Sequence, residues 1–145
     1  MKKAMNADDD LNRFLEAQQT VYDRALAEIQ QGRKQSHWMW YIFPQIAGLG
    51  LSETARFYAI RNLEEARAYL EHPVLGQRLI EISTAFLTLE GKTAHQILGY
   101  PDELKLRSSM TLFAVPDNTH PVFQAVLDHF FDGIPDPQTL ERIQK

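Results

Sequence analysis

The residues best suited to chemistry gather in the segment 33–45, RKQSHWMWYIFPQ, which holds both tryptophans of the chain. Arg33 and Lys34 precede Trp38 and Trp40, and Gln45 closes the segment. Cations beside aromatic rings can bind a phosphate or carboxylate while a ring stacks on a planar ligand. The two basic residues also suit the negative C-terminal end of a preceding helix, which needs no ligand. Both interpretations remain open.

Gln18 and Tyr22 form a second polar pair, four residues apart on an otherwise apolar helix face. A buried amide costs free energy unless its hydrogen bonds are satisfied. Gln18 is therefore either a core amide satisfied by neighbouring backbone or a polar group that faces a pocket.

Asp102, Lys105 and Ser109 share one helix ridge at spacings of three and four residues. A lysine beside a serine can activate the hydroxyl as a nucleophile, but only if burial depresses the lysine pKa. An exposed ridge with an ordinary Asp–Lys pair is the alternative.

A glycine-bearing loop follows the tryptophans, with Gly48, Gly50 and Ser52 leading into a helix. Such a loop can offer free N–H groups to an anion. It lacks the Gly-Lys-Ser/Thr ending and the preceding strand of a nucleotide-binding motif, and a turn with left-handed backbone explains the glycines as well.

The five histidines, at 37, 72, 95, 120 and 129, lack the i, i+4 spacing of helix-borne metal ligands. We expect no metal site and no cofactor.

Composition limits the class of protein. A chain of 145 residues with 44% hydrophobic residues predicts one packed domain, and the net charge of −4 makes a nucleic-acid partner unlikely. There is no cysteine, hence no disulfide framework or thiolate site. No apolar run approaches the length of a membrane span, and no apolar segment follows Met1-Lys2-Lys3. We expect a cytoplasmic protein that makes no use of a membrane.

Apolar residues recur with a period near 3.6 almost throughout, and alternating runs are missing. The sequence predicts an all-α, single compact domain of about seven to nine helices over residues 9–145, after a disordered tail of residues 1–8. We expect Ser36, Ser52, Asn62, Thr93 and Asp136 to begin helices, and Pro73 and Pro101 to stand at first helical positions. The expected helices cover residues 9–31, 36–43, 53–59, 63–70, 73–90, 93–99, 101–115, 122–133 and 136–143. For the aromatic-rich segment 36–43 a strand is the alternative.

Five blocks of this sequence resemble a known family: 33–45 (RKQSHWMWYIFPQ), 48–52 (GLGLS), 58–60 (YAI), 72–76 (HPVLG) and 105–113 (KLRSSMTLF). Together they are similar to the bacterial domain-of-unknown-function 1810 family, over roughly residues 10–143. The resemblance implies an all-α single domain and brings no catalytic residues. Members are often labelled calpastatin, but calpastatins are disordered inhibitor chains and this composition is that of a packed domain.

Two functional hypotheses follow. The first is a pocket for a small anionic ligand such as a nucleotide or phosphorylated metabolite, with binding or hydrolysis left open. Its candidate residues are Gln18, Tyr22, Arg33, Lys34, Trp38, Trp40, Gln45, Lys105 and Ser109. The second is a protein-interaction module that uses an aromatic groove.

The pocket hypothesis makes two geometric predictions. One tryptophan should be mostly buried while the other lines a groove, because residues two apart on a helix diverge by about 200°. At least three of Gln18, Tyr22, Gln45, Lys105 and Ser109 should converge beside the tryptophans.

Overall fold

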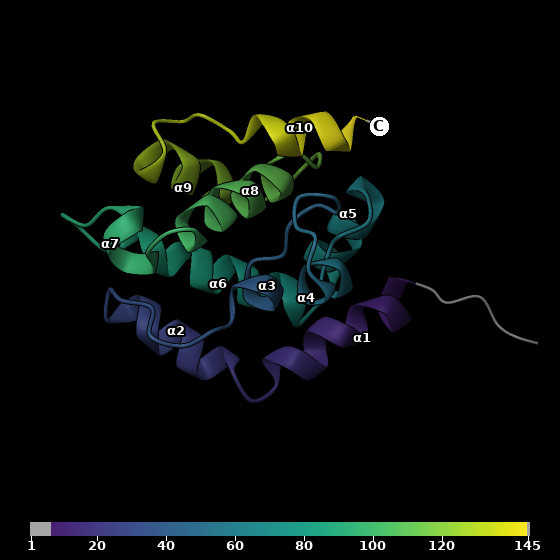
Figure 1. The fold of residues 1–145 in the computed structure, drawn as a ribbon, viewed down its shortest axis with the longest axis horizontal. Helices are drawn as coiled ribbons and strands as arrows, with labels where there is room; N and C mark the ends of the chain where they lie inside the picture. Colours follow the sequence, from purple (N-terminus) through teal and green to yellow (C-terminus); the bar gives the residue numbers. More distant parts are fainter. Residues whose placement is uncertain (1–6, 145) are drawn as a thin grey trace, which may run out of the picture.

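Every regular element of the described chain is a helix, as the 3.6-residue period predicts (Figure 1). The computed structural model describes the backbone of residues 7–144 and the side chains of residues 10–144. Most of the predicted tail of residues 1–8 lies outside this range, and its last two residues begin the first helix. Over residues 7–144 extended segments pair only once, in an isolated parallel bridge between Ile46 and Ile60. The all-α class is therefore confirmed.

Ten helices are present within residues 7–144, one more than the upper limit of the prediction. They are α1 (Ala7–Gln18), α2 (Tyr22–Gln30), α3 (Met39–Ile42), α4 (Glu53–Phe57), α5 (Leu63–Glu71), α6 (Leu75–Leu87), α7 (Ala94–Leu98), α8 (Asp102–Ala114), α9 (Val122–Phe130) and α10 (Pro137–Ile143).

The additional helix arises because the predicted helix 9–31 is broken at residues 19–21. The break lets α1 pack on α3 and α5 while α2 packs on α6. Leu11 and Phe14 of α1 and Ala25 and Ile29 of α2 are all fully buried. No proline or glycine marks residues 18–22, so the turn follows from tertiary packing rather than from a local breaker.

Four of the predicted helix-starting residues are N-caps. The side chains of Ser52, Asn62, Thr93 and Asp136 each accept a hydrogen bond from the backbone N–H three residues on. Thr93 also forms a full capping box with Gln96. These helices begin where local hydrogen bonding predicts.

Three predicted helix starts are wrong. Pro101 is the N-cap of α8, which begins at Asp102, and not its first helical residue. Ser36 does not cap α3, because its hydroxyl donates to the carboxylate of Glu28 at 2.6 Å. Pro73 does not open α6, which begins at Leu75. The imidazole Nδ1 of His72 accepts from the N–H groups of Val74 and Leu75 and so acts as the cap instead.

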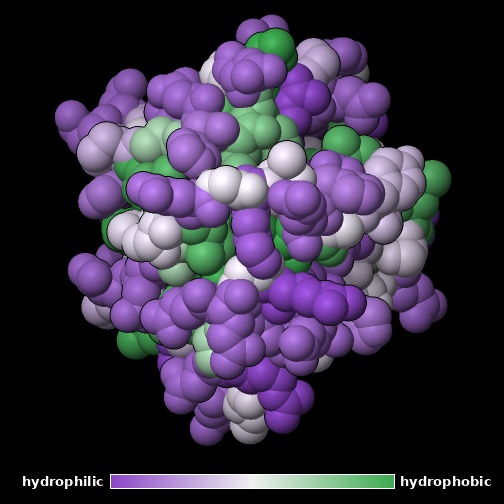
Figure 2. Space-filling view, turned by 90° about the vertical axis from the view of Figure 1, so that its left-hand side faces the viewer, coloured by the Kyte–Doolittle hydropathy of each residue, from purple (hydrophilic) through white to green (hydrophobic). Residues whose placement is uncertain are grey.

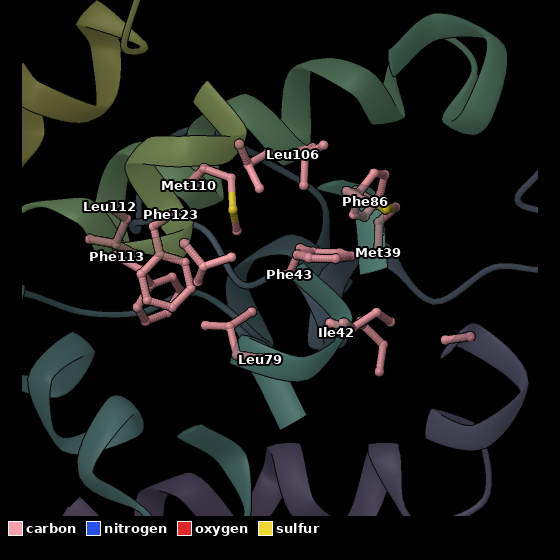
Figure 3. Packing of buried hydrophobic residues seen from close by; sticks show 14 of the residues in the cluster. Met39, Ile42, Phe43, Leu79, Phe86, Leu106, Met110, Leu112, Phe113 and Phe123 are labelled. Carbon is pink, nitrogen blue, oxygen red and sulfur yellow. The ribbon is translucent and has the colours of Figure 1, made fainter. Parts of the chain in front are cut away.

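The helices form layers around one hydrophobic core (Figure 1). In this view α1 and α2 lie below, α3 and α6 in the middle, and α8, α9 and α10 above, while α6 contacts α2, α5 and α9. Figure 3 shows the centre of the core, where Phe43 and Phe86 lie close to Leu106 and Met110. The ring centroids of Phe43 and Phe86 are 5.6 Å apart.

The face of the molecule at the α7 end is mainly polar (Figure 2). Figure 2 shows the side of the molecule that is on the left in Figure 1, and its hydrophobic residues form small separate patches. This face therefore offers no large apolar area to a partner. No helix within the described residues has the length and apolar character needed to cross a membrane.

Candidate functional site

A buried carboxylate fixes the segment that carries the tryptophans. Glu28 of α2 accepts hydrogen bonds from the N–H groups of Gln35 and Ser36, the Ser36 hydroxyl and the Trp38 indole, at 2.6–3.0 Å. Burial alone would raise the pKa of Glu28, but these donors outweigh it and lower the pKa to about 2. The carboxylate is therefore ionised at neutral pH and locks Trp38 into the core.

A chain of charges runs from this segment to α8. The two carboxylate oxygens of Asp102 accept separately from Lys34 Nζ at 2.8 Å and from Lys105 Nζ at 3.1 Å. Each ammonium also lies over an indole ring, Lys34 over Trp38 at 5.3 Å and Lys105 over Trp40 at 4.1 Å. One carboxylate thus serves two ammonium groups, which leaves an excess positive charge in this cluster.

These cations are poorly exposed to water. The side chain of Lys34 is 8% exposed, that of Asp102 18% and that of Lys105 21%. Partial burial strengthens electrostatic interactions because it lowers the local dielectric constant. A ligand anion that reaches Lys105 would therefore be attracted more strongly than at an open surface.

Two hollows flank the pair formed by Trp40 and Lys105, and both residues line both hollows. The first, of about 320 Å³, is also lined by Gln45, Gly50 and Leu104. The second, of about 290 Å³, is lined by residues of the 34–41 segment, Thr54 and Asp102. We call the two hollows together the Trp40 groove. Each lobe is near the lower end of the size of small-molecule sites.

The α8–α10 wall of the first lobe is held by a network of hydrogen bonds. Arg107 donates to the carbonyl groups of Ile134 and Pro135, both at 2.9 Å. Asp136 accepts from the Ser108 hydroxyl at 3.0 Å and caps α10. Arg107 and Asp136 bring one charge of each sign to this wall of the groove, so its excess positive charge comes from Lys105.

Two glycines shape the loop opposite α8. A Cβ atom at Gly50 would lie 2.5 Å from Ala55 Cβ and 3.4 Å from the Trp40 ring, so only glycine allows this close approach. Gly48 has a φ of +100°, and a Cβ there would meet the Arg142 guanidinium. The glycines therefore serve the turn and its packing, which is one of the two alternatives drawn from the sequence.

Five of the nine residues predicted for the site lie together in the Trp40 groove: Lys34, Trp38, Trp40, Gln45 and Lys105. Trp38 is 1% exposed, whereas Trp40 is partly exposed and lines both lobes. The prediction of one buried and one groove-lining tryptophan is therefore confirmed.

The other four lie elsewhere. Arg33 is exposed and lines neither lobe. Ser109 is fully buried and lines neither lobe, and its hydroxyl has no hydrogen-bond partner among the described residues. Ser109 is therefore not placed to act as a nucleophile in the groove.

Gln18 and Tyr22 belong to a separate network. The Gln18 amide donates to the Tyr41 carbonyl at 2.7 Å and to the Tyr69 hydroxyl at 2.9 Å, so it is a satisfied core amide. The Tyr22 hydroxyl donates to the Arg78 carbonyl and to the Glu81 carboxylate. Burial, and to a smaller extent the hydrogen bond to Glu81, raises the pKa of Tyr22. Of the five residues expected to converge, only Gln45 and Lys105 line the groove, fewer than the three predicted.

Two residues of the site region, and one contact of a third residue, escaped the sequence analysis. Glu28 gave no signal, because a glutamate near the end of an amphipathic helix is normally exposed. Arg107 lies two residues from Lys105 in a segment already singled out, but its carbonyl partners follow only from the fold. Asp102 was foreseen beside Lys105 but not beside Lys34, because that contact joins segments far apart in the sequence. No group of three or more potential metal ligands occurs in the described part of the chain.

Fold and site together define a single-domain helical protein with a cationic, tryptophan-lined groove. The chain belongs to the family described as Protein of unknown function (DUF1810), whose model matches residues 8–143. It is similar to the conserved hypothetical protein Rv1873 from Mycobacterium tuberculosis, known from a crystal structure. The identity is 44% and the TM-score 0.92, over 94% of this chain and 97% of the other. No curated protein matches the chain. The family resemblance inferred from the sequence is confirmed.

Proposed function

We propose that the Trp40 groove binds a small anionic ligand with a planar group, such as a nucleotide or a phosphorylated metabolite. The observation that carries the proposal is the sharing of one carboxylate, Asp102, by two ammonium groups, Lys34 and Lys105. If Lys105 turns to a ligand, Asp102 still neutralises the more deeply buried Lys34. The ligand anion would then pair with Lys105 without leaving a buried charge unpaired.

The neighbours of Lys105 support the same class of ligand. Trp40 is partly exposed and lines both lobes, so its indole can contact a planar ring once Lys105, which lies over the indole at 4.1 Å, turns to the ligand anion. The Gln45 side chain in the first lobe can orient polar groups of that ring. The two lobes of about 320 and 290 Å³ meet at Trp40 and Lys105. Their arrangement suits a ligand that places a ring in one lobe and an anionic group beside Lys105.

We favour binding over hydrolysis. Ser109, the nucleophile considered in the sequence, is fully buried and lines neither lobe. Ser108 does line the groove, but its hydroxyl is engaged with the Leu104 carbonyl and Asp136. Serine nucleophiles need an adjacent general base, and the one carboxylate beside Ser108, Asp136, is committed to capping α10, where it also accepts from the N–H and hydroxyl of Thr139.

Titration of the protein with AMP, ATP and inorganic phosphate, followed by tryptophan fluorescence and thermal shift, tests the proposal. We expect a nucleotide to raise the melting temperature and to quench Trp40 fluorescence. Lys105→Met, which keeps the apolar stem but removes the charge, should weaken nucleotide binding at least tenfold. Lys92→Met is the matched control outside the groove and should bind like wild type. Equal binding by Lys105→Met and wild type, or no effect of any of the three ligands, would contradict the proposal.

A protein partner is the second candidate. Leu104 lines the first lobe and is 46% exposed, and Leu51, beside Gly50, is 76% exposed. Exposed leucines at the rim of a groove are typical of protein-binding surfaces. If the nucleotide panel fails while Leu51→Ser together with Leu104→Ser abolishes capture of a specific protein, this second function gains support.

A further inference from the structure

A hollow of about 590 Å³ lies apart from the Trp40 groove. It is formed by α5, by Ile80 of α6 and by the loop 116–120 between α8 and α9. None of its lining residues lines either lobe of the Trp40 groove. We call it the α5 hollow. Its volume is well within the range of small-molecule sites.

The floor of the α5 hollow is apolar. Pro116 is buried, and Leu70 and Ile80 are partly buried and pack against the hydrophobic core. Such a floor removes apolar ligand surface from water and gains roughly 25 cal/mol per Å².

The rim carries charges that the protein itself does not neutralise. Arg67 and Glu71 project from successive turns of α5, and Asp117 lies in the facing loop. All three are exposed, and their side chains form no hydrogen bond or ion pair with the side chains and backbone of residues 10–144. The rim thus combines one guanidinium with two carboxylates above an apolar floor.

The loop that faces α5 is held in place. The Thr119 hydroxyl donates to the Phe113 carbonyl at 2.6 Å, and Thr119 N–H donates to the Pro116 carbonyl at 3.2 Å. His120 Nδ1 accepts from the Val122 N–H at 3.0 Å, so the neutral imidazole carries its proton on Nε2. This ring nitrogen remains a donor for a ligand. The loop therefore presents its polar groups from a fixed backbone.

We infer that the α5 hollow binds a free α-amino acid with an apolar side chain. The ammonium group would pair with Glu71 and Asp117, the carboxylate with Arg67, and the side chain would cover Leu70 and Ile80. Two carboxylates against one guanidinium leave an excess negative charge, so an ammonium is the group the site needs most. A ligand carboxylate adds to the affinity because Arg67 can donate two parallel N–H hydrogen bonds to its two oxygens.

Three related probes separate these contributions: L-leucine, L-leucinamide, which lacks the carboxylate, and 4-methylpentanoate, which lacks the ammonium. Binding to the full chain is followed by the amide NMR shifts of residues 117–120, titrated to a dissociation constant. We expect L-leucine to bind and 4-methylpentanoate to bind at least tenfold more weakly. Glycine, which lacks the apolar side chain, should also bind at least tenfold more weakly.

Variants assign each contact. Arg67→Ala should weaken L-leucine at least fivefold while leaving L-leucinamide unchanged, because only the first ligand carries a carboxylate. Asp117→Asn should weaken both. Arg24 is an exposed arginine on α2, so Arg24→Ala is the matched control and should change the binding of neither L-leucine nor L-leucinamide. Lys105→Met should leave leucine binding intact, which makes this test independent of the Trp40 groove.

Several results would overturn the inference. The first is the absence of amide shifts at residues 117–120 with 10 mM L-leucine. The second is equal binding of 4-methylpentanoate and L-leucine. The third is an Arg67→Ala variant that binds both L-leucine and L-leucinamide like wild type. Because Arg67 and Asp117 are exposed, these substitutions should leave the fold unchanged, and the remaining NMR signals report this directly.

Discussion

Glu28 shows how one buried charge can organise a site from a distance. Its carboxylate does not line the Trp40 groove, yet it accepts from the backbone of Gln35 and Ser36 and from the Trp38 indole. These bonds fix the segment that brings Lys34 beside Asp102. The position of the groove's positive charge therefore depends on a residue that does not itself line the groove.

The depressed pKa of Glu28 predicts a specific dependence of stability on pH. Since the pKa falls from the usual 4.5 to about 2 on folding, the stabilisation is complete above pH 4.5 and is lost as the pH falls toward 2. The full shift corresponds to roughly 3 kcal/mol. Glu28→Gln should lower the free energy of unfolding by about 3 kcal/mol at pH 7 and by much less at pH 2. Urea denaturation between pH 2 and 7 measures the difference between the two proteins.

Glu16→Gln provides the control, because Glu16 is exposed on α1 and should leave the pH profile unchanged. A difference between wild type and Glu28→Gln that stays constant from pH 7 to pH 2 would show that the charge of Glu28 is not what holds the segment.

At the residue scale the sequence predicted those members of the site that lie close together in the chain. Lys34, Trp38, Trp40 and Gln45 fall in one segment, so their proximity is nearly guaranteed by covalent connection. Gln18 was misplaced for a physical reason. Spacing put it on a shared face with Tyr22, but across the turn at residues 19–21 both side chains contact Arg78 of α6 and not the Trp40 groove. Local spacing cannot reveal a turn that tertiary packing imposes.

Helix ends were predictable wherever a side chain provides the cap. Ser52, Asn62, Thr93 and Asp136 bond to N–H groups three residues away, so the signal is contained in four residues of sequence. The start of α6 was not predictable in this way, because His72 is an uncommon cap and Pro73 is the usual first helical residue.

The junction of α5 and α6 depends on the small size of one residue. A Cβ atom at Gly76 would lie 2.1 Å from the Leu70 carbonyl oxygen, which is backbone and cannot move aside cheaply. Gly76→Ala should therefore lower the free energy of unfolding by about 2 kcal/mol, although helix propensity alone favours alanine. Chemical denaturation of the purified variant measures this change.

Gln77→Ala is the matched control, since Gln77 is the exposed next residue of α6 and its change should stay within about 0.5 kcal/mol. If Gly76→Ala were as stable as wild type or more so, the close α5–α6 contact would not constrain the fold.

For the whole molecule, composition and period were enough to predict the helical class and a single domain. Both follow from sums over many residues, so individual errors such as the broken first helix do not change them. The Trp40 groove could not be predicted in full, because it requires α3, the loop 44–52 and the α8–α10 wall to meet. Contacts of this kind join residues about 60 positions apart, such as Trp40 and Lys105.

One core also predicts one unfolding transition. Buried residues from Leu11 to Leu127 form a single hydrophobic cluster that includes both Trp38 and Phe86. Figure 3 shows Phe86 in this cluster. The ring of Phe86 lies 5.6 Å from Phe43 and 5.9 Å from Phe130, which links the middle layer to α9. Loss of these contacts should therefore weaken the whole molecule together rather than one helix alone.

Phe86→Ala tests this cooperativity. The substitution removes a fully buried ring and should cost about 3–5 kcal/mol. Helix content by far-UV circular dichroism and tryptophan fluorescence should report the same lowered urea midpoint. Phe57→Ala, which removes a ring that is 58% exposed, should shift the midpoint far less. If the two probes gave separate midpoints in wild type or in Phe86→Ala, the layers would unfold independently, and a ligand in the Trp40 groove would then stabilise only the helices that it touches.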